Sequence, residues 1–145
     1  GFVAVMLAHF SSYASGSDAL FNFKIALVAA AVIGHIFPVF AGFRGGKGVA
    51  TLAGAVAGVY PPAVGLCLLV FIIVLMLTHY VSLSSMTAGI AFPIFIIFLF
   101  GERSTSLVIF SCVIAVLLLI THRKNIGRLI HHTESKTYLG KRKPE

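Results

Sequence analysis

The sequence predicts an all-α protein, a polytopic transmembrane helical bundle with about five to six membrane segments, one of them a short or half-helix. Hydrophobic residues make up 59% of the 145 residues, charged residues only 10%, and the mean hydropathy is +1.03. A soluble domain carries about 25% charged residues, so this chain lacks the polar surface that a water-facing exterior needs. Disorder is excluded because a chain this apolar can bury enough surface to offset its conformational entropy.

Four apolar stretches approach the length of about 20 residues that a helix needs to cross a membrane. They are residues 23–43, 62–78, 83–100 and Thr105–Thr121. Residues 1–13 look like the end of a fifth helix, so we expect the natural protein to have further residues before Gly1. Residues Val49–Val59 are apolar but reach only about 16 Å at about 1.5 Å per residue. We expect a half-helix enclosed by protein, or a short packed crossing.

The basic residues gather on one side of this predicted bundle. If Val49–Val59 reaches the far side and the two prolines after it turn the chain back, three segments share one face: residues 44–48, residues 79–82 and everything after His122. That face holds nine of the 11 Lys and Arg residues, and the positive-inside rule assigns it to the cytoplasm. We therefore divide the chain into a transmembrane helical domain, residues 1–121, and a cytoplasmic basic C-terminal segment, residues 122–145. This charge distribution favours a membrane surface over nucleic acid.

The most informative stretch reads GHIFPVFAGFRGGKGVAT over residues 34–51. Its candidate phosphate-binding residues are Gly45, Gly46, Lys47, Gly48 and Thr51. Glycines let backbone N–H groups approach an anion closely, and the loop leads into the N-terminus of the Val49–Val59 helix, which favours phosphate. Lys47 adds a positive charge and Thr51 a hydroxyl. The alternative is a flexible hairpin whose Arg44 and Lys47 only obey the positive-inside rule.

A second polar cluster follows His79, which we expect at the membrane interface. It contains Ser82, Ser84 and Ser85 at the start of the next predicted helix. Serine at such a place is first of all an N-cap, the role we expect for Ser82. Three serines in four positions exceed what a cap requires, so we expect one or more of them to face a polar ligand.

The third cluster, residues 121–129, directly follows the last membrane helix. If the helix continues, His122 and Asn125 lie on one face by their i, i+3 spacing, while Ile126 and Leu129 can anchor the segment to the membrane surface. The alternative is an amphipathic basic helix lying on anionic lipid.

Two other kinds of site do not fit, and the two cysteines do not point to a third. A nucleotide P-loop fails because Ala41 and Gly48 stand where that motif requires glycine and Ser or Thr. A metal site fails because no carboxylate or cysteine joins the C-terminal histidines at ligand spacing. Cys67 and Cys112 lie in apolar runs, where we expect them to serve packing.

Taken together, GHxFPVFxGF[RK]GGKGVAT, YVSLSS and HxxNIxRL(x)4ExK resemble the bacterial acyl-phosphate-dependent glycerol-3-phosphate acyltransferases, the PlsY family. The match runs from about Gly1 to Lys136 with the three clusters in the family's order. The resemblance implies an integral enzyme of the bacterial inner membrane that makes phospholipid precursors, with its active site facing the cytoplasm. It would transfer a fatty acyl group from acyl phosphate to the 1-hydroxyl of glycerol 3-phosphate, giving lysophosphatidate and phosphate. No cofactor or metal is implied, and the partners are these substrates and membrane lipids.

The resemblance also implies roles for single residues. His122 and Asn125 match the family's essential His and Asn and are the expected catalytic residues, the glycine loop holds a substrate phosphate, and Glu134 is structural. The expected pocket residues are His35, Arg44, Ser82, Ser84, Ser85 and Arg128. Proton removal falls to His122 or to a substrate phosphate.

The sequence departs from the family pattern in one important respect. The family's first motif, a run like GSGNxGATN, is absent and would precede Gly1, so we expect this chain alone to be inactive. Thr121 also stands where the family often has arginine. Two rival interpretations are a transporter of a phosphorylated solute, since half-helices aimed at anions are typical of transporters, and a scaffold that holds anionic lipid through its basic tail.

Overall fold

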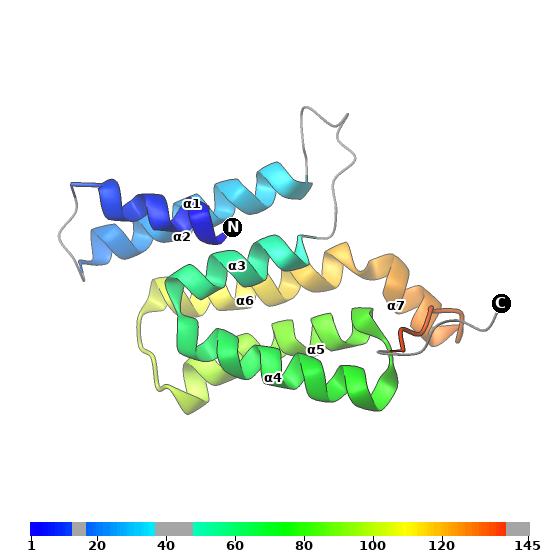
Figure 1. The fold of residues 1–145 in the computed structure, drawn as a ribbon. Helices are drawn as coiled ribbons and strands as arrows, with labels where there is room; N and C mark the ends of the chain where they lie inside the picture. The colour runs from blue at the N-terminus through cyan, green and yellow to red at the C-terminus, as the bar shows by residue number, and fades with distance from the viewer. Residues whose placement is uncertain (13–16, 37–47, 139–145) are drawn as a thin grey trace.

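The computed structural model describes residues 1–12, 17–36 and 48–138 (Figure 1). Their regular structure is entirely helical, which confirms the predicted all-α class. The helices are α1 (Phe2–Met6), the 3-10 helix η1 (Leu7–Phe10), α2 (Asp18–Ile36), α3 (Val49–Val59), α4 (Pro61–Thr78), α5 (Val81–Ile94), the π-helical turn η3 (Phe95–Leu99), α6 (Thr105–Thr121) and α7 (Arg123–Ile130).

Within the described residues, two continuous helices are long and apolar enough to cross a membrane: Pro61–Thr78 and Val81–Leu99. The second contains Pro93 and continues through the π-helical turn η3. A third candidate is the pair α6 and α7, which is bent by 60°. The apolar part of α2 and the 11-residue α3 are shorter, so α3 is the short helix that the sequence predicts.

The start of α2 corrects one predicted boundary. The predicted apolar stretch starts at residue 23, but α2 begins at Asp18. The side-chain oxygen of Ser17 accepts a hydrogen bond from the backbone N–H of Leu20 at 3.1 Å. This is the usual N-cap contact, and it starts the helix one turn before the apolar run.

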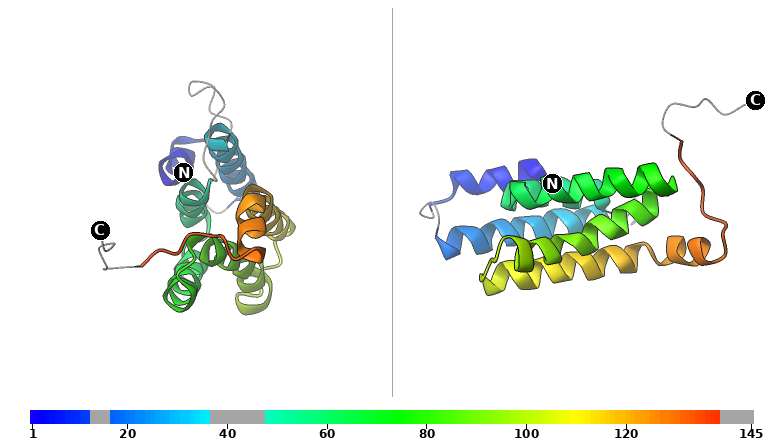
Figure 2. Two further views of the ribbon diagram at one scale, coloured as in Figure 1. Left: turned by 90° about the vertical axis from the view of Figure 1, so that its right-hand side faces the viewer. Right: turned by 90° about the horizontal axis from the view of Figure 1, so that it is seen from below.

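The chain passes back and forth, so its turns gather at two ends of the bundle (Figure 1). The start of α3, the turn between α4 and α5, and α7 lie at one end, as the topology argument predicts. The turns between α3 and α4 and between η3 and α6 lie at the other end. Seen along the bundle, α1 and α2 cover α3 on one side, and α4, α5 and α6 lie on its other side (Figure 2).

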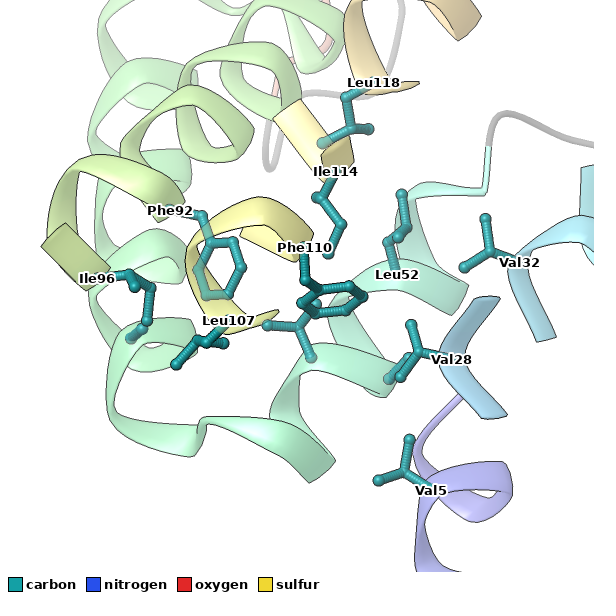
Figure 3. Close-up of a cluster of buried hydrophobic side chains, with 13 residues drawn as sticks. Val5, Val28, Val32, Leu52, Phe92, Ile96, Leu107, Phe110, Ile114 and Leu118 are labelled. Atoms are coloured by element: carbon teal, nitrogen blue, oxygen red, sulfur yellow. The ribbon is translucent and has the colours of Figure 1, made fainter. Parts of the chain in front are cut away.

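The core is an apolar cluster to which α1, α2, α3, the start of α4, α5, η3 and α6 contribute (Figure 3). Along α6, the buried apolar side chains are Leu107, Phe110, Ile114 and Leu118, whose spacing of three to four residues forms one face of a helix. Gly89 of α5 allows the close approach of α6, because a Cβ atom there would collide with Leu118. In contrast, only 11% of the residues of α4 are buried, which suits a helix that faces lipid over most of its length.

Candidate functional site

A polar cavity of about 400 Å³ lies at the end of the bundle that carries α7. Its lining residues come from α3, α4, α5, α7, the α6–α7 bend and the extended segment that follows α7. They are Val49, Ala50, Phe71, Val81, Ser82, Ser85, His122, Asn125, Arg128, Glu134, Ser135 and Thr137. The structure thus brings together the serine cluster and the third polar cluster, which lie about 40 positions apart in the sequence.

His122 occupies the bend between α6 and α7 and is 1% exposed. Its Nδ1 lies 2.8 Å from the backbone oxygen of Leu118 and 3.4 Å from the hydroxyl of Thr121. A carbonyl oxygen can only accept, so we assign the proton of the neutral imidazole to Nδ1. Nε2 is then the ring nitrogen that can take up a proton.

Asn125 lies one turn further along and is 3% exposed. Its Nδ2 donates to Oε1 of Glu134 at 2.5 Å, and the Ser82 hydroxyl donates to the same oxygen at 2.6 Å. Arg128 Nε donates to the other carboxylate oxygen, Oε2, also at 2.6 Å. One carboxylate therefore joins α5, α7 and the extended segment.

These contacts keep Glu134 ionised. Burial of its carboxyl group raises the pKa, but hydrogen bonds from Ser82, Arg128 and Asn125 and the Arg128 charge outweigh that effect. The pKa falls from 4.5 to about 2. At neutral pH, Glu134 is therefore an acceptor with no proton to donate.

The segment of residues 133–138, here called the C-terminal strap, runs from α7 back to the turn between α4 and α5. The backbone N–H of Thr137 donates to the His79 carbonyl oxygen at 2.7 Å. The rings of His79 and Tyr138 lie 4.6 Å apart, and Lys136 Nζ lies 5.5 Å from the centroid of the Tyr80 ring. Glu134 and these contacts hold the strap along one wall of the cavity.

The predicted cap of α5 is wrong. The N-cap residue is Tyr80, without a side-chain cap, and α5 begins at Val81. The Ser82 hydroxyl donates a hydrogen bond to Glu134 instead, so it does not cap the start of α5. Ser84 and Ser85 donate to backbone oxygens four residues earlier. Ser82 and Ser85 line the cavity, whereas Ser84 is buried and not among its lining residues.

The glycine loop ends at Gly48, which directly precedes α3 and is not itself among the residues that line the cavity. Gly48 has a positive φ of 77° and accepts the backbone N–H of Leu52 at 2.7 Å, which starts α3. The first α3 residues, Val49 and Ala50, line the cavity, so the N-terminus of α3 borders it. Arg44, Gly45, Gly46 and Lys47 lie outside the described residues.

Two expected site residues lie elsewhere. Thr51 is half-buried in the first turn of α3, and His35 is exposed at the end of α2. Neither lines the cavity. Conversely, we had not predicted Phe71, Val81, Ser135 or Thr137 as lining residues. Phe71 reaches the cavity through packing of α4, and Ser135 and Thr137 through the return of the strap, so motif spacing carries no signal for these three. Val81 lies next to Ser82 inside the YVSLSS motif, but its apolar side chain gave no reason to expect it at a polar site.

A second cavity of about 330 Å³ continues from the first and is apolar. The two cavities share Val49, Phe71 and Ser85. Its other lining residues come from α3, α4, α5 and α6 and are Leu52, Ala53, Val56, Val64, Cys67, Leu68, Ala88, Gly89, Phe92, Ile114 and Leu118. A polar chamber thus adjoins an apolar groove that lies further inside the bundle.

Comparison with known proteins agrees with this arrangement. The family model described as "Glycerol-3-phosphate acyltransferase" matches residues 1–132. The chain belongs to the glycerol-3-phosphate acyltransferase family. Within this family it is 42% identical to the glycerol-3-phosphate acyltransferase of Chlorobium luteolum over 135 residues, covering 77% of this chain and 57% of the relative. It is 46% identical to that of Salinibacter ruber over 110 residues, covering 73% and 48%.

Solved structures of the family have the same fold. The crystal structure of PlsY, an integral membrane glycerol 3-phosphate acyltransferase, in its lysophosphatidic acid form aligns with a TM-score of 0.78 and 33% identity, covering 94% of this chain and 66% of that one. The glycerol 3-phosphate form aligns with a TM-score of 0.71 and 26% identity, covering 94% and 88%. The chain spans about half the length of the curated relatives it matches.

Proposed function

We propose that this protein is a membrane acyltransferase that moves a fatty acyl group from acyl phosphate to the 1-hydroxyl of glycerol 3-phosphate. The observation that carries this proposal is the polar cavity with His122 and Asn125 next to an apolar groove that shares three of its lining residues. An acyl phosphate has a charged head and an apolar chain, so it matches both chambers at once. The family's proteins, named as glycerol-3-phosphate acyltransferases, give the acceptor.

The polar chamber has features that suit a phosphate group. The N-terminus of α3 borders it, and the unpaired N–H groups and dipole of a helix start favour an anion. The side chain of Arg128 lies at the cavity, and the ion pair with Glu134 leaves it half-exposed, at 47%. We propose that the glycine loop, residues 45–48 with the charged side chain of Lys47, completes this site, as the family resemblance implies.

The chemistry that follows needs little from the protein, because an acyl phosphate is already activated. The hydroxyl oxygen of glycerol 3-phosphate attacks the acyl carbonyl carbon, the bond from that carbon to the phosphate oxygen breaks, and phosphate leaves with the bonding electrons. The hydroxyl proton passes to His122 Nε2 or to a substrate phosphate. The residues mainly align the hydroxyl with the carbonyl and stabilise the developing charge.

We further propose that the enzyme lies in the bacterial inner membrane, with the cavity at the cytoplasmic face. The α7 end of the bundle carries Arg123, Lys124, Arg128 and Lys136, and the positive-inside rule places such an end in the cytoplasm. In this orientation the division at residue 121 separates membrane helices from a cytoplasmic segment.

The test is phosphate release by the full-length protein in detergent, supplied with acyl phosphate and glycerol 3-phosphate. We expect release that requires both substrates and that His122→Ala abolishes. Glu102→Ala is the control, because Glu102 lies at the opposite end of the bundle, where it accepts a hydrogen bond from Tyr60. Release independent of glycerol 3-phosphate, or uptake of glycerol 3-phosphate into vesicles without release, would contradict the proposal and favour the transporter.

A further inference from the structure

The two ends of the Asn125 carboxamide differ in their hydrogen bonding. Its nitrogen donates to Glu134, but its oxygen, Oδ1, is buried and has no hydrogen-bond partner among the described residues. Buried polar side-chain atoms nearly always have a partner, so an exception in a cavity wall calls for an explanation. Asn125 lines the polar cavity, and a donor on a bound ligand is the partner this oxygen lacks.

Glu134 determines which end of the amide faces which way. An ionised carboxylate only accepts hydrogen bonds, so the NH₂ end of Asn125 must face it. The reversed amide would place its oxygen against the Glu134 oxygen. Ser82 and Arg128 hold the carboxylate from two other elements, so the carboxylate is itself fixed in place.

We propose that Glu134 is a positioning residue that orients the Asn125 carboxamide so that Oδ1 accepts a hydrogen bond from a hydroxyl group of the acceptor substrate. This inference rests on the proposed function and deepens it, because it assigns Asn125 to the hydroxyl-bearing acceptor. Phosphate oxygens offer no proton in their fully ionised form, whereas each hydroxyl of glycerol 3-phosphate is a donor. Glu134 would act only through Asn125.

A double-mutant cycle on the full-length protein tests this dependence. We expect Asn125→Ala to lower kcat about 100-fold and Glu134→Ala to lower it by at least about tenfold. The double variant should be no slower than Asn125→Ala alone, within about threefold, because Glu134 has nothing left to orient. If the loss of kcat in the double variant equals the product of the losses in the two single variants, Glu134 acts independently of Asn125 and the inference is overturned.

An exchange of the two groups keeps the test informative if Glu134→Ala does not fold. Asn125→Asp sets two carboxylates against each other, and we expect a loss of activity similar to that of Asn125→Ala. Adding Glu134→Gln supplies an amide that donates to the new carboxylate and again leaves one oxygen for the substrate. We expect the double variant to have a kcat at least about tenfold higher than that of Asn125→Asp alone. No restoration in a folded double variant would contradict the inference.

Glu134→Gln alone provides the conservative comparison. Its oxygen still accepts from Asn125, while the charge that pairs with Arg128 is lost, so we expect a decrease of no more than about fivefold. A decrease as large as that of Glu134→Ala would contradict a positioning role.

Failure of the proposed function can be told apart from failure of this inference. If the wild-type protein releases no phosphate, the same variants are compared by calorimetric binding of glycerol 3-phosphate. Binding weakened in the same non-additive pattern would support the inference without the acyltransferase. Binding unaffected by Asn125→Ala, or no binding, would overturn it.

Discussion

Removal of the Glu134 carboxylate should destabilise the protein more than removal of any other carboxylate in the described residues. Glu134→Ala takes away the acceptor of three hydrogen bonds, one from α5 and two from α7. Two of the donors, Ser82 and Asn125, are at most 5% exposed. A buried donor left without its partner costs about 1–3 kcal/mol, so these two together contribute about 2–6 kcal/mol.

Two features of the site place the expected loss in the lower half of that range. The adjoining cavity of about 400 Å³ has room for water, which can reach groups that lose their partner. The side chain of Arg128 is 47% exposed, so loss of its ion pair costs about 0–1 kcal/mol. The expected total is about 3 kcal/mol.

Thermal unfolding of the full-length protein in detergent measures this loss. For a protein of this size, about 3 kcal/mol corresponds to a decrease in Tm of roughly 6–12 °C. The matched control is Glu102→Ala, which removes one hydrogen bond from Tyr60 and should cost about 1 kcal/mol. Limited proteolysis should also cut the C-terminal strap sooner in the Glu134 variant. Equal decreases in Tm for the two variants would refute the view that Glu134 joins α5, α7 and the strap.

Three further predictions concern pH, catalysis and chain length. The pKa of Glu134 is lowered from 4.5 to about 2, so the stabilisation that its carboxylate provides is complete above about pH 4.5 and is lost as the pH falls toward 2. The difference in Tm between wild type and Glu134→Ala should therefore narrow as the pH falls through this window. A constant difference would contradict the lowered pKa of Glu134. His122→Ala should lower kcat about 10²–10⁴-fold, whereas an unchanged kcat would remove His122 from the chemistry. Ala88→Phe should displace at least two methylenes from the apolar groove, at about 0.8 kcal/mol each. In competition between long-chain and short-chain acyl phosphates, the ratio of the two kcat/KM values should therefore shift about tenfold toward the short chain. The control is Ile73→Phe, on the exposed face of α4. An equal shift in both variants would show that the groove does not hold the acyl chain.

The helical class and most of the helix positions followed from apolar length and composition, because a membrane helix needs a long run of apolar residues. The short α3 between the glycine loop and the prolines was predicted for the same reason. The start of α2 was missed because the polar residues Asp18 and Asn22 interrupt the apolar run, and hydropathy alone does not register the cap that Ser17 provides.

The candidate site was predictable in its residues but not in its connections. The motifs identified His122, Asn125 and Glu134, and the structure places all three at one cavity. Nothing in their spacing indicates that Ser82 donates to Glu134 instead of capping α5, since that contact spans 52 positions. The lining by Phe71 and by the strap likewise depends on packing between distant segments.

The most direct test of the account is the formation of lysophosphatidate by the full-length protein, followed by mass spectrometry with isotope-labelled glycerol 3-phosphate and acyl phosphate. We predict one lysophosphatidate for each phosphate released, with the acyl group on the 1-hydroxyl, and a decrease of about 100-fold or more in the rate of formation of both products in His122→Ala and in Asn125→Ala. Phosphate release without labelled lysophosphatidate, or synthesis that neither substitution slows, would contradict the assignment of this cavity as an acyltransferase site.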